Sequence, residues 1–347
     1  MWAYFCPVIF AINARLSLSF PINPYQSLLN HYPSRSIPYT TMITFDPNLV
    51  SHRDFHQILL SGVAPRPIAF VTSRDSEGTV NLAPFSFFNA FASKPPIVAI
   101  GPAIAAATGR EKDTLLNILE TGECTISTVS YPFVEQMNLA STDYPRGVDE
   151  FTKSGLSKAE SQVVSVPYVA EAQIAMECTL VHNIELFREK GGNGNIMLLR
   201  VERLHVQESA MTDGRIDPRK MDLVARMGYS WYARVTPEAC FESVQPRVKG
   251  IGFDALPERV RHSKILSGND LALLAGVPAI PDLDAGADTK QAFIDAGGDI
   301  DALNTQAASL AATHAMSTEE YVAHSMAQKL LAGRNIAAAW QCVLSIG

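Results

Sequence analysis

The chain has 347 residues, of which 47% are hydrophobic and 18% charged, and its formal net charge at pH 7 is −7. This composition is typical of a folded globular protein with an ample core, and it excludes an intrinsically disordered chain. The acidic balance argues against a general nucleic-acid binder, because phosphate contacts need clustered Lys and Arg side chains. The five cysteines include no C-x-x-C pair, so we expect no disulfide framework, no zinc site and a reducing, cytoplasmic location.

Residues 1–41 differ in character from the rest of the chain, since they contain two arginines but no Asp or Glu. Their apolar run Trp2–Ala14 is too short to span a bilayer, so no membrane association is expected, and no positive charge precedes it as in a signal peptide. Two interpretations stay open. We favour translated sequence upstream of a start at Met42; the alternative is a transit peptide for import into an organelle. In either case we expect this segment to be disordered and exclude it from the fold.

Residues 66–101 carry the clearest strand signals. The apolar run Ile68–Val71 and the run Thr79–Ala83 flank the turn-forming sequence Asp75-Ser76-Glu77-Gly78, and this arrangement predicts a hairpin. A third strand is expected over Ile97–Ile100, after a break at Lys94-Pro95-Pro96.

The segment before that break has an unusual composition, because Ser86 and Asn89 stand among three phenylalanines. Such a segment can lay an apolar wall against a flat ligand while offering a few polar groups. If it is a strand, Phe85 and Phe87 share one face and Phe88 points to the other. One set would then pack in the core while the other faces a ligand.

Helix and strand signals alternate in the middle of the chain. Asp113 is expected to cap a helix that ends at Gly122, because an acidic residue suits an N-cap and glycine suits the C-terminal position. A strand over Glu123–Val129 and a helix over Val134–Ser141 should follow. The polar stretch Arg146–Ser157 is expected to be a surface loop that becomes ordered near a ligand or partner.

Two long strand signals, Ile174–Leu186 and Asn195–Val206, flank the turn sequence Gly191–Gly194 and predict a second hairpin. Several antiparallel strands with interspersed helices favour a small closed or partly closed barrel over a βαβ sheet. No G-x-G-x-x-G motif follows a strand, so a Rossmann domain is not expected. Alanine becomes dense from residue 254 onward, and helices are predicted over four stretches, 258–273, 288–296, 302–313 and 318–345.

Three motifs, PRPIAFV, APFSFFN and KDTLLNI, occur together in this order between Pro65 and Ile118. With them the chain resembles the flavin-reductase-like family, in particular its flavoredoxin-like branch, over roughly residues 42–253. The resemblance implies an FMN-binding split β-barrel: mainly antiparallel β-structure with helices, Greek-key-like, forming a homodimer that holds FMN near the interface. Residues 254–347 then form a helical C-terminal extension, which we interpret as a cover or dimer arm and not as a separate catalytic domain.

The resemblance also implies where FMN would bind. Its phosphate needs cations, hydroxyls and free N–H groups, so Arg110 and Lys112 are assigned to charge neutralisation and Thr114 to a hydroxyl hydrogen bond, while Asp113 caps the helix. The isoalloxazine ring needs an apolar slot with hydrogen bonds at its polar edge. The residues assigned to it are Arg66, Pro84, Phe85, Ser86, Phe87, Asn89 and Tyr232.

For several of these residues a purely structural role remains open. Arg66 could approach the flavin or only cap the sheet, and Tyr232 and Trp231 could line the site or pack in a core or interface. Tyr229 stands where the similar family segment has a second glycine, which leaves the close backbone approach of that segment open. The eight histidines suggest no metal centre, and His182, in an apolar strand, is expected to be a buried structural residue.

The function implied is hydride transfer from NADH or NADPH to FMN in an oxidoreductase of the flavin-reductase type. Because the flavin itself carries the difficult chemistry, we predict no catalytic acid or base among the side chains. Two alternatives stay open: an electron-transfer module that holds FMN tightly without oxidising a nicotinamide, and a dimeric scaffold that has lost its cofactor. The choice between NADH and NADPH and the final electron acceptor cannot be derived from the residues.

Overall fold

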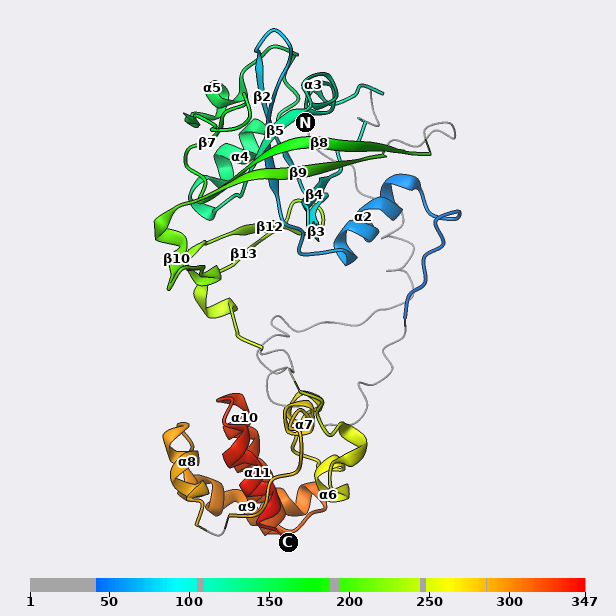
Figure 1. Cartoon of the computed structure of the whole chain (residues 1–347). Coiled ribbons are helices and arrows are strands. Elements are labelled where there is room, and N and C mark those ends of the chain that lie inside the picture. The colour runs from blue at the N-terminus through cyan, green and yellow to red at the C-terminus, as the bar shows by residue number, and fades with distance from the viewer. Residues whose placement is uncertain (1–41, 105–108, 188–193, 244–247, 285, 347) are drawn as a thin grey trace. The chain divides into compact units, whose positions relative to one another are not determined.

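The computed structural model of the chain describes residues 42–104, 109–187, 194–243, 248–284 and 286–346 (Figure 1). They form two compact units, one spanning Thr44–Ser243 and a second that covers the chain from residue 244 onward. The leader and the first three residues of the predicted Gly191–Gly194 turn lie outside the described residues.

The first unit is built on one antiparallel sheet of seven strands with the order β2-β1-β5-β8-β9-β4-β3. The strands are β1 (Ala69–Arg74), β2 (Val80–Phe85), β3 (Phe88–Ser93), β4 (Pro96–Ile100), β5 (Glu123–Ser127), β8 (Ile174–Leu186) and β9 (Gly194–Val206). The two edge strands, β2 and β3, are joined by Ser86 and Phe87 alone. Since so short a link cannot cross a flat sheet of seven strands about 4.8 Å apart, the sheet must curl so that the end of β2 lies close to the start of β3. This is the split β-barrel that the motifs imply.

Both predicted hairpins are present. In the first, β1 and β2 pair from Ala69 opposite Phe85 to Arg74 opposite Val80. The turn is closed by Asp75, whose Oδ1 accepts the N–H of Thr79 at 2.8 Å. In the second hairpin, β8 and β9 pair along their whole length, with two register shifts.

The expectation for the phenylalanine segment was wrong, because Phe85 and Phe88 belong to different strands. Phe85 ends β2 and is buried, with 9% of its surface exposed, whereas Phe88 begins β3. Phe87 lies in the bend between the strands and is 41% exposed, so it does not share a buried face with Phe85. The alternation of a single strand does not continue through a bend.

Four helices accompany the sheet: α2 (His52–Gly62), α3 (Asp113–Thr121), α4 (Val134–Ala140) and α5 (Glu150–Ser154). Helix α3 ends as predicted at Gly122, which has φ 74°, but Asp113 does not cap it. Asp113 is instead its first helical residue, and Lys112 occupies the N-cap position without a side-chain capping bond. The Asp113 carboxylate turns to two arginines described below. Leu115 and Ile118 of α3 pack into the core of the barrel.

The stretch Arg146–Ser157 is not only a surface loop, since it contains α5. Phe151 on this helix is 2% exposed and packs in a core cluster with Phe70 and Leu82. The neighbouring Glu150 is 7% exposed, and its Oε2 accepts the N–H of Leu82 at 2.9 Å. The expectation failed because the stretch is polar in composition, which gave no sign that Phe151 and Glu150 are buried.

Short strands and turns complete the first unit. They are β6 (Lys158–Ala159), β7 (Tyr168–Val169), β10 (Met211–Thr212), β11 (Arg215–Ile216), β12 (Val224–Arg226) and β13 (Tyr232–Arg234). Strand β12 is tied to the start of the barrel by an antiparallel bridge in which Arg66 and Arg226 exchange both backbone hydrogen bonds at 2.9 Å. His182, expected to be buried, is exposed on β8.

The second unit is helical, as predicted, and has its own core. Its helices are α6 (Glu258–Arg261), α7 (Gly268–Ala275), α8 (Thr289–Asp295), α9 (Ile300–His314), α10 (Thr318–Ala332) and α11 (Ile336–Leu344). Trp340 is 1% exposed at the centre of a cluster that includes Leu274 and Leu330. None of the helices in the described part of the chain is long and apolar enough to cross a membrane.

Two of the four helical stretches predicted for this unit are divided. The stretch 258–273 breaks because Ser267 and Asp270 form a capping box that begins α7 as a new helix. The stretch 318–345 breaks after α10, where Arg334 has φ 61° and the Asn335 side chain accepts the N–H of Ala338 to begin α11.

Candidate functional site

Two adjoining pockets lie where β2 passes the start of α3 and the loop before β13. We call the smaller the polar pocket; its volume is about 80 Å³. Six residues assigned to FMN from the sequence line it, namely Pro84, Phe85, Arg110, Lys112, Asp113 and Thr114. The start of a helix, an ammonium, a guanidinium and a hydroxyl therefore meet in a space of the size of a phosphate group.

The cations of the polar pocket are already engaged with carboxylates. Lys112 Nζ is 3.6 Å from Asp143 Oδ1, and Arg110 Nη2 is 3.3 Å from Asp113 Oδ2 and 3.8 Å from Asp143. Arg146 holds Asp113 from the other side at 3.2 Å. Most of these side chains are substantially exposed, and exposed ion pairs contribute only about 0–1 kcal/mol each, so the carboxylates hold the two cations weakly.

The hydroxyl of the polar pocket is fixed from β2. Thr114 is 1% exposed, and its Oγ1 accepts a hydrogen bond from Asn81 Nδ2 at 2.9 Å. Because that bond uses the oxygen as acceptor, the hydroxyl proton remains available to donate. Asn81 also lines the pocket and was not singled out from the sequence, although its place in the predicted strand before APFSFFN could have indicated it.

Glu150 is a second lining residue that sequence reasoning missed. Burial raises the pKa of its carboxyl group, the N–H of Leu82 acts in the opposite sense, and Asp149 and Asp113 raise it further. The polar pocket is therefore lined by a buried carboxyl group that is protonated more readily than an exposed one.

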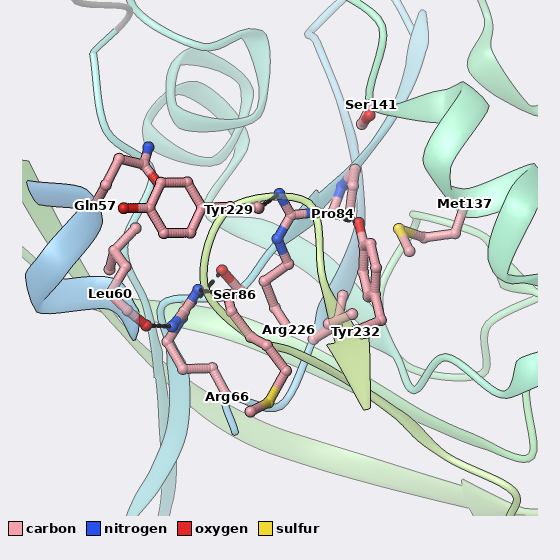
Figure 2. Close-up of a pocket in the computed structure, with 12 residues that line it drawn as sticks. Gln57, Leu60, Arg66, Pro84, Ser86, Met137, Ser141, Arg226, Tyr229 and Tyr232 are labelled. Atoms are coloured by element: carbon pink, nitrogen blue, oxygen red, sulfur yellow. Dashed lines mark hydrogen bonds between the residues drawn. The ribbon is translucent and has the colours of Figure 1, made fainter. Parts of the chain in front are cut away.

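The larger pocket, which we call the arginine pocket, has a volume of about 300 Å³ (Figure 2). Its twelve lining residues are Gln57, Leu60, Arg66, Ile68, Pro84, Ser86, Met137, Ser141, Arg226, Met227, Tyr229 and Tyr232. Four of them, Arg66, Pro84, Ser86 and Tyr232, were assigned to the flavin ring from the sequence. The twelve include two arginines but no Asp, Glu, Lys or His.

Arg66 is the most buried cation of this site, with 7% of its surface exposed. Its Nη1 donates to the carbonyl oxygens of Leu60 at 2.5 Å and Val63 at 2.6 Å, and its Nη2 donates to that of Met227 at 3.0 Å. Its Nε is 3.5 Å from Ser86 Oγ. Arg66 thus ties the end of α2 to the loop after β12, and its approach to a flavin stays a prediction.

Arg226 lies beside it, between two tyrosines (Figure 2). Its Nη1 donates to the hydroxyl of Tyr232, its Nη2 donates to the carbonyl oxygen of Tyr229 at 2.5 Å, and its guanidinium carbon is 4.6 Å from the centre of the Tyr232 ring. Burial lowers the pKa of Arg66, and the charge of Arg226 lowers it further.

The backbone after β12 has the geometry of a glycine-rich segment. Tyr229 has φ 53°, a left-handed conformation that glycine adopts without cost. Gly228 lies so close to α2 that a Cβ atom there would be 2.1 Å from Ser61 Oγ. The close approach at Gly228 is therefore to α2, and an approach of this backbone to a cofactor stays a prediction.

The two pockets adjoin each other, and Pro84 and Ser141 line both. The arginine pocket shares Arg66 and Ser86 with a third and larger space of about 670 Å³, which we call the apolar cavity. Phe87 and Asn89, also assigned to the flavin, line this cavity and neither of the two pockets.

Trp231 lines none of the three spaces and is 74% exposed. Arg226, Met227 and Ser141 were missed from the sequence. Arg226 and Met227 had a signal, because they stand in the segment Ala225–Tyr232 that was compared with the family. Within the described residues, no cluster of three or more His, Cys, Asp or Glu could hold a metal ion.

Comparison with known proteins gives this geometry a context. Residues 61–220 match the flavin reductase like domain. An uncharacterized protein of Deinococcus radiodurans is 40% identical over 191 residues, which cover 53% of this chain and 82% of that protein. The uncharacterized protein YwrF of Bacillus subtilis is 32% identical over 208 residues, covering 59% of this chain and 100% of YwrF.

Two solved structures share the fold. Nitrilotriacetate monooxygenase component B from Bacillus cereus is 33% identical with a TM-score of 0.55, covering 59% of this chain and 99% of that one. The 2-nitrobenzoate 2-nitroreductase of Pseudomonas fluorescens is 27% identical with a TM-score of 0.52, covering 61% of this chain and 100% of that one. The family model matches the barrel, and this chain covers 82% of a relative that is 40% identical to it. The chain therefore belongs to the flavin reductase like domain family.

Proposed function

We propose that this protein binds FMN and reduces it with a nicotinamide nucleotide, as an oxidoreductase of the flavin-reductase type. Members of the family typically bind FMN. The observation that carries the proposal is that the polar pocket adjoins the arginine pocket, with Pro84 and Ser141 lining both. A phosphate-sized cationic space beside a space large enough for a flat ring system matches the two ends of FMN.

The chain's own residues divide the task of binding. In the polar pocket Lys112 and Arg110 would neutralise the phosphate, and the Thr114 hydroxyl would donate a hydrogen bond to it. In the arginine pocket Pro84, Met137 and Tyr232 offer apolar and aromatic surface to the ring, and Ser86 offers a hydroxyl. A bound flavin supplies the capacity to accept a hydride. The protein then has to position the ring, tune its charge and keep one face open to the donor.

The similar structures support an enzyme more than a scaffold. One bears the name of a monooxygenase component and the other that of a nitroreductase, and both are matched over essentially their full length. We assign no acid or base to a side chain, because hydride transfer to a flavin does not require one. The donor's identity, NADH or NADPH, is left to experiment.

We further propose that the protein acts as a homodimer whose second copy covers the apolar cavity. The cavity opens beside edge strand β3, where Phe91 is 68% exposed, and beside Phe87, which is 41% exposed. An unpaired strand edge next to large exposed aromatic side chains is a surface that soluble proteins normally cover. Light scattering should give twice the mass of the chain, and a monomer at micromolar concentration would contradict this part of the proposal.

The test is an absorbance spectrum of the purified protein with added FMN, followed by anaerobic addition of NADH and then NADPH. A flavin spectrum that bleaches with one of the nucleotides supports the enzyme and identifies its donor. A bound flavin that resists both but bleaches with dithionite would favour the electron-transfer alternative. Absence of any flavin uptake would leave the scaffold.

A further inference from the structure

The arginine pocket has an unbalanced charge. Arg66 and Arg226 both line it, and no acidic residue is among its twelve lining residues. Within the described part of the chain, the ion pairs of arginines are those of Arg110, Arg146, Arg200, Arg219 and Arg234, and neither Arg66 nor Arg226 takes part in one. Arg66 is nearly fully buried, so water screens its charge poorly. Two like charges with no partner are unusual in a partly buried site, since buried charges in proteins are normally paired.

Backbone pairing fixes both arginines on the same side. Arg66 and Arg226 are directly opposite each other in an antiparallel bridge, so their side chains leave the backbone on one face. Each guanidinium is then held by carbonyl oxygens: Arg66 by those of Leu60, Val63 and Met227, and Arg226 by that of Tyr229. Carbonyls orient the groups without neutralising them. The pocket is therefore prepared for a negative charge that the chain itself does not supply.

The shape of the pocket restricts what carries that charge. Beside the two arginines it is lined by the polar side chains of Gln57, Ser86 and Ser141 and by several apolar or aromatic ones, of which Met137, Pro84 and Tyr232 face the same space (Figure 2). A compact phosphate already has a suitable place in the adjoining polar pocket. A charge spread over a flat ring system fits the arginine pocket better, because guanidinium groups are themselves planar and stack on ring faces.

Building on the proposed function, we infer that Arg66 and Arg226 stabilise the negative charge that the flavin ring acquires when it is reduced. A hydride brings two electrons and one proton from the nicotinamide, whose ring becomes cationic. The neutral flavin ring that accepts the hydride then carries one negative charge unless it takes a second proton from solvent. The two guanidinium groups favour the anionic form over the protonated one and so favour reduction. They are positioning and electrostatic residues that transfer no proton.

The decisive measurement is the ratio of the affinities for oxidised and reduced FMN, in the whole protein and in two variants. Arg226→Gln removes the charge but keeps a side chain able to bond the Tyr229 carbonyl, and Arg226→Lys restores the charge. We expect Arg226→Gln to weaken binding of reduced FMN about tenfold more than binding of oxidised FMN. For two electrons this corresponds to a fall of about 30 mV in the potential of bound FMN. Arg226→Lys should recover most of the loss.

Arg234→Gln is the matched control. Arg234 lies on β13, but its guanidinium is paired with Asp222 at 2.6 and 2.8 Å and stacks 3.8 Å from the centre of the Tyr131 ring, outside the pocket. Its loss should leave the affinity ratio unchanged. A second readout is the number of protons taken up per two electrons at neutral pH. It should be close to one in the wild type and rise toward two in Arg226→Gln, a change that a purely structural role would not produce.

The outcomes separate this inference from the proposed function. If wild-type protein binds no FMN, both fail. If it binds FMN but binds the reduced form more weakly than the oxidised form, the inference fails and the proposed function stands; this result needs no variant and so holds even if Arg226→Gln does not fold. An unchanged ratio in Arg226→Gln, with weaker binding of benzoate to the FMN-loaded protein, would mean that the arginines receive an anionic substrate, and would also overturn the inference.

Discussion

Lys112 and Thr114 are the residues on which the placement of the phosphate depends. Replacing both, as Lys112→Ala with Thr114→Ala, should weaken FMN binding about tenfold to a hundredfold, because a hydrogen bond to a charged group contributes roughly 1.5–3 kcal/mol. The fold should persist, since neither side chain belongs to the hydrophobic clusters of the barrel. Fluorescence titration with FMN and circular dichroism measure the two effects. Lys264→Ala, an exposed lysine of the second unit, is the control. An unchanged affinity in the double variant would remove the phosphate assignment.

Replacement of Asp143 should have the opposite effect on FMN affinity. Its side chain is 65% exposed and lies 3.6 Å from Lys112 Nζ, where it competes with a phosphate for the same cation. Asp143→Asn should therefore strengthen FMN binding about twofold to fivefold, in line with the roughly 0–1 kcal/mol of an exposed ion pair. The affinity for riboflavin, which lacks the phosphate, should be the same in Asp143→Asn and in the wild type. Weaker FMN binding in Asp143→Asn would show that the carboxylate supports the site and does not compete for it.

At this scale the sequence predicted the residues that stand in a motif and missed those brought in from elsewhere. Arg110, Lys112 and Thr114 lie within five residues of each other at a helix start, so local pattern was enough to group them. Glu150 reaches the polar pocket from a stretch that is polar in sequence. Asp113 was given the wrong role because the choice between capping a helix and pairing with Arg146 depends on a residue 33 positions away.

Helices and strands were predictable where periodicity extends over several turns or pairs. The long strands β8 and β9 and helix α3 satisfied that condition, and their limits agree with the expectation to within a residue or two. Predictions failed at breaks governed by a single residue. The capping box at Ser267 and the left-handed Arg334 divide alanine-rich stretches whose composition alone favours one continuous helix. The bend at Ser86 and Phe87 is another such break.

Helix α10 gives a prediction on pH. His324 is fully buried on this helix, and its Nδ1 lies 2.9 Å from Ser263 Oγ, which ties α10 to the segment before α7. Burial lowers the pKa of His324 to about 4, and the charge of Arg259 acts in the same direction. In the unfolded chain His324 is therefore protonated below about pH 6.5, whereas in the folded unit it is protonated only below about pH 4. Stability is complete above pH 6.5 and declines as the pH falls through this window, by about 3 kcal/mol in total.

The free energy of unfolding can be measured between pH 7 and pH 4.5 by urea unfolding followed by Trp340 fluorescence. The other two tryptophans are removed by Trp2→Phe and Trp231→Phe so that Trp340 alone reports. His324→Leu, which cannot titrate, should flatten the dependence while conserving most of the packing. A slope that is equally steep in His324→Leu would assign the pH dependence to other groups.

The whole molecule consists of two units with separate cores, and each should unfold by itself. Leu330→Ala in the helical unit and Ile126→Ala in the barrel both remove side chains with no exposed surface. Each should destabilise its own unit by about 2–5 kcal/mol and leave the other unchanged. Scanning calorimetry of the full chain should then show two transitions, of which each variant lowers one. A parallel shift of both transitions in either variant would mean that the units unfold together.

The barrel was predictable as a whole because two of its hairpins, β1–β2 and β8–β9, are local in sequence and because three motifs mark the family. The interior of the second unit was not, since its core draws on residues from Leu256 to Val343 that share no local motif. Sequence composition gave its class, and only the packing around Trp340 shows that it is an independently organised unit.

Pro84 joins the two pockets from a strand at the edge of the sheet, and its position affects more than ligand binding. A proline has no N–H to offer a further strand, so this edge is a poor template for strand addition by another chain. The opposite edge, β3, carries no such residue between Phe88 and Ser93. The two edges of the sheet therefore differ in how readily they pair with another chain. Self-association and aggregation should proceed through β3. The edge formed by β2, which borders the two pockets, should stay accessible to small molecules.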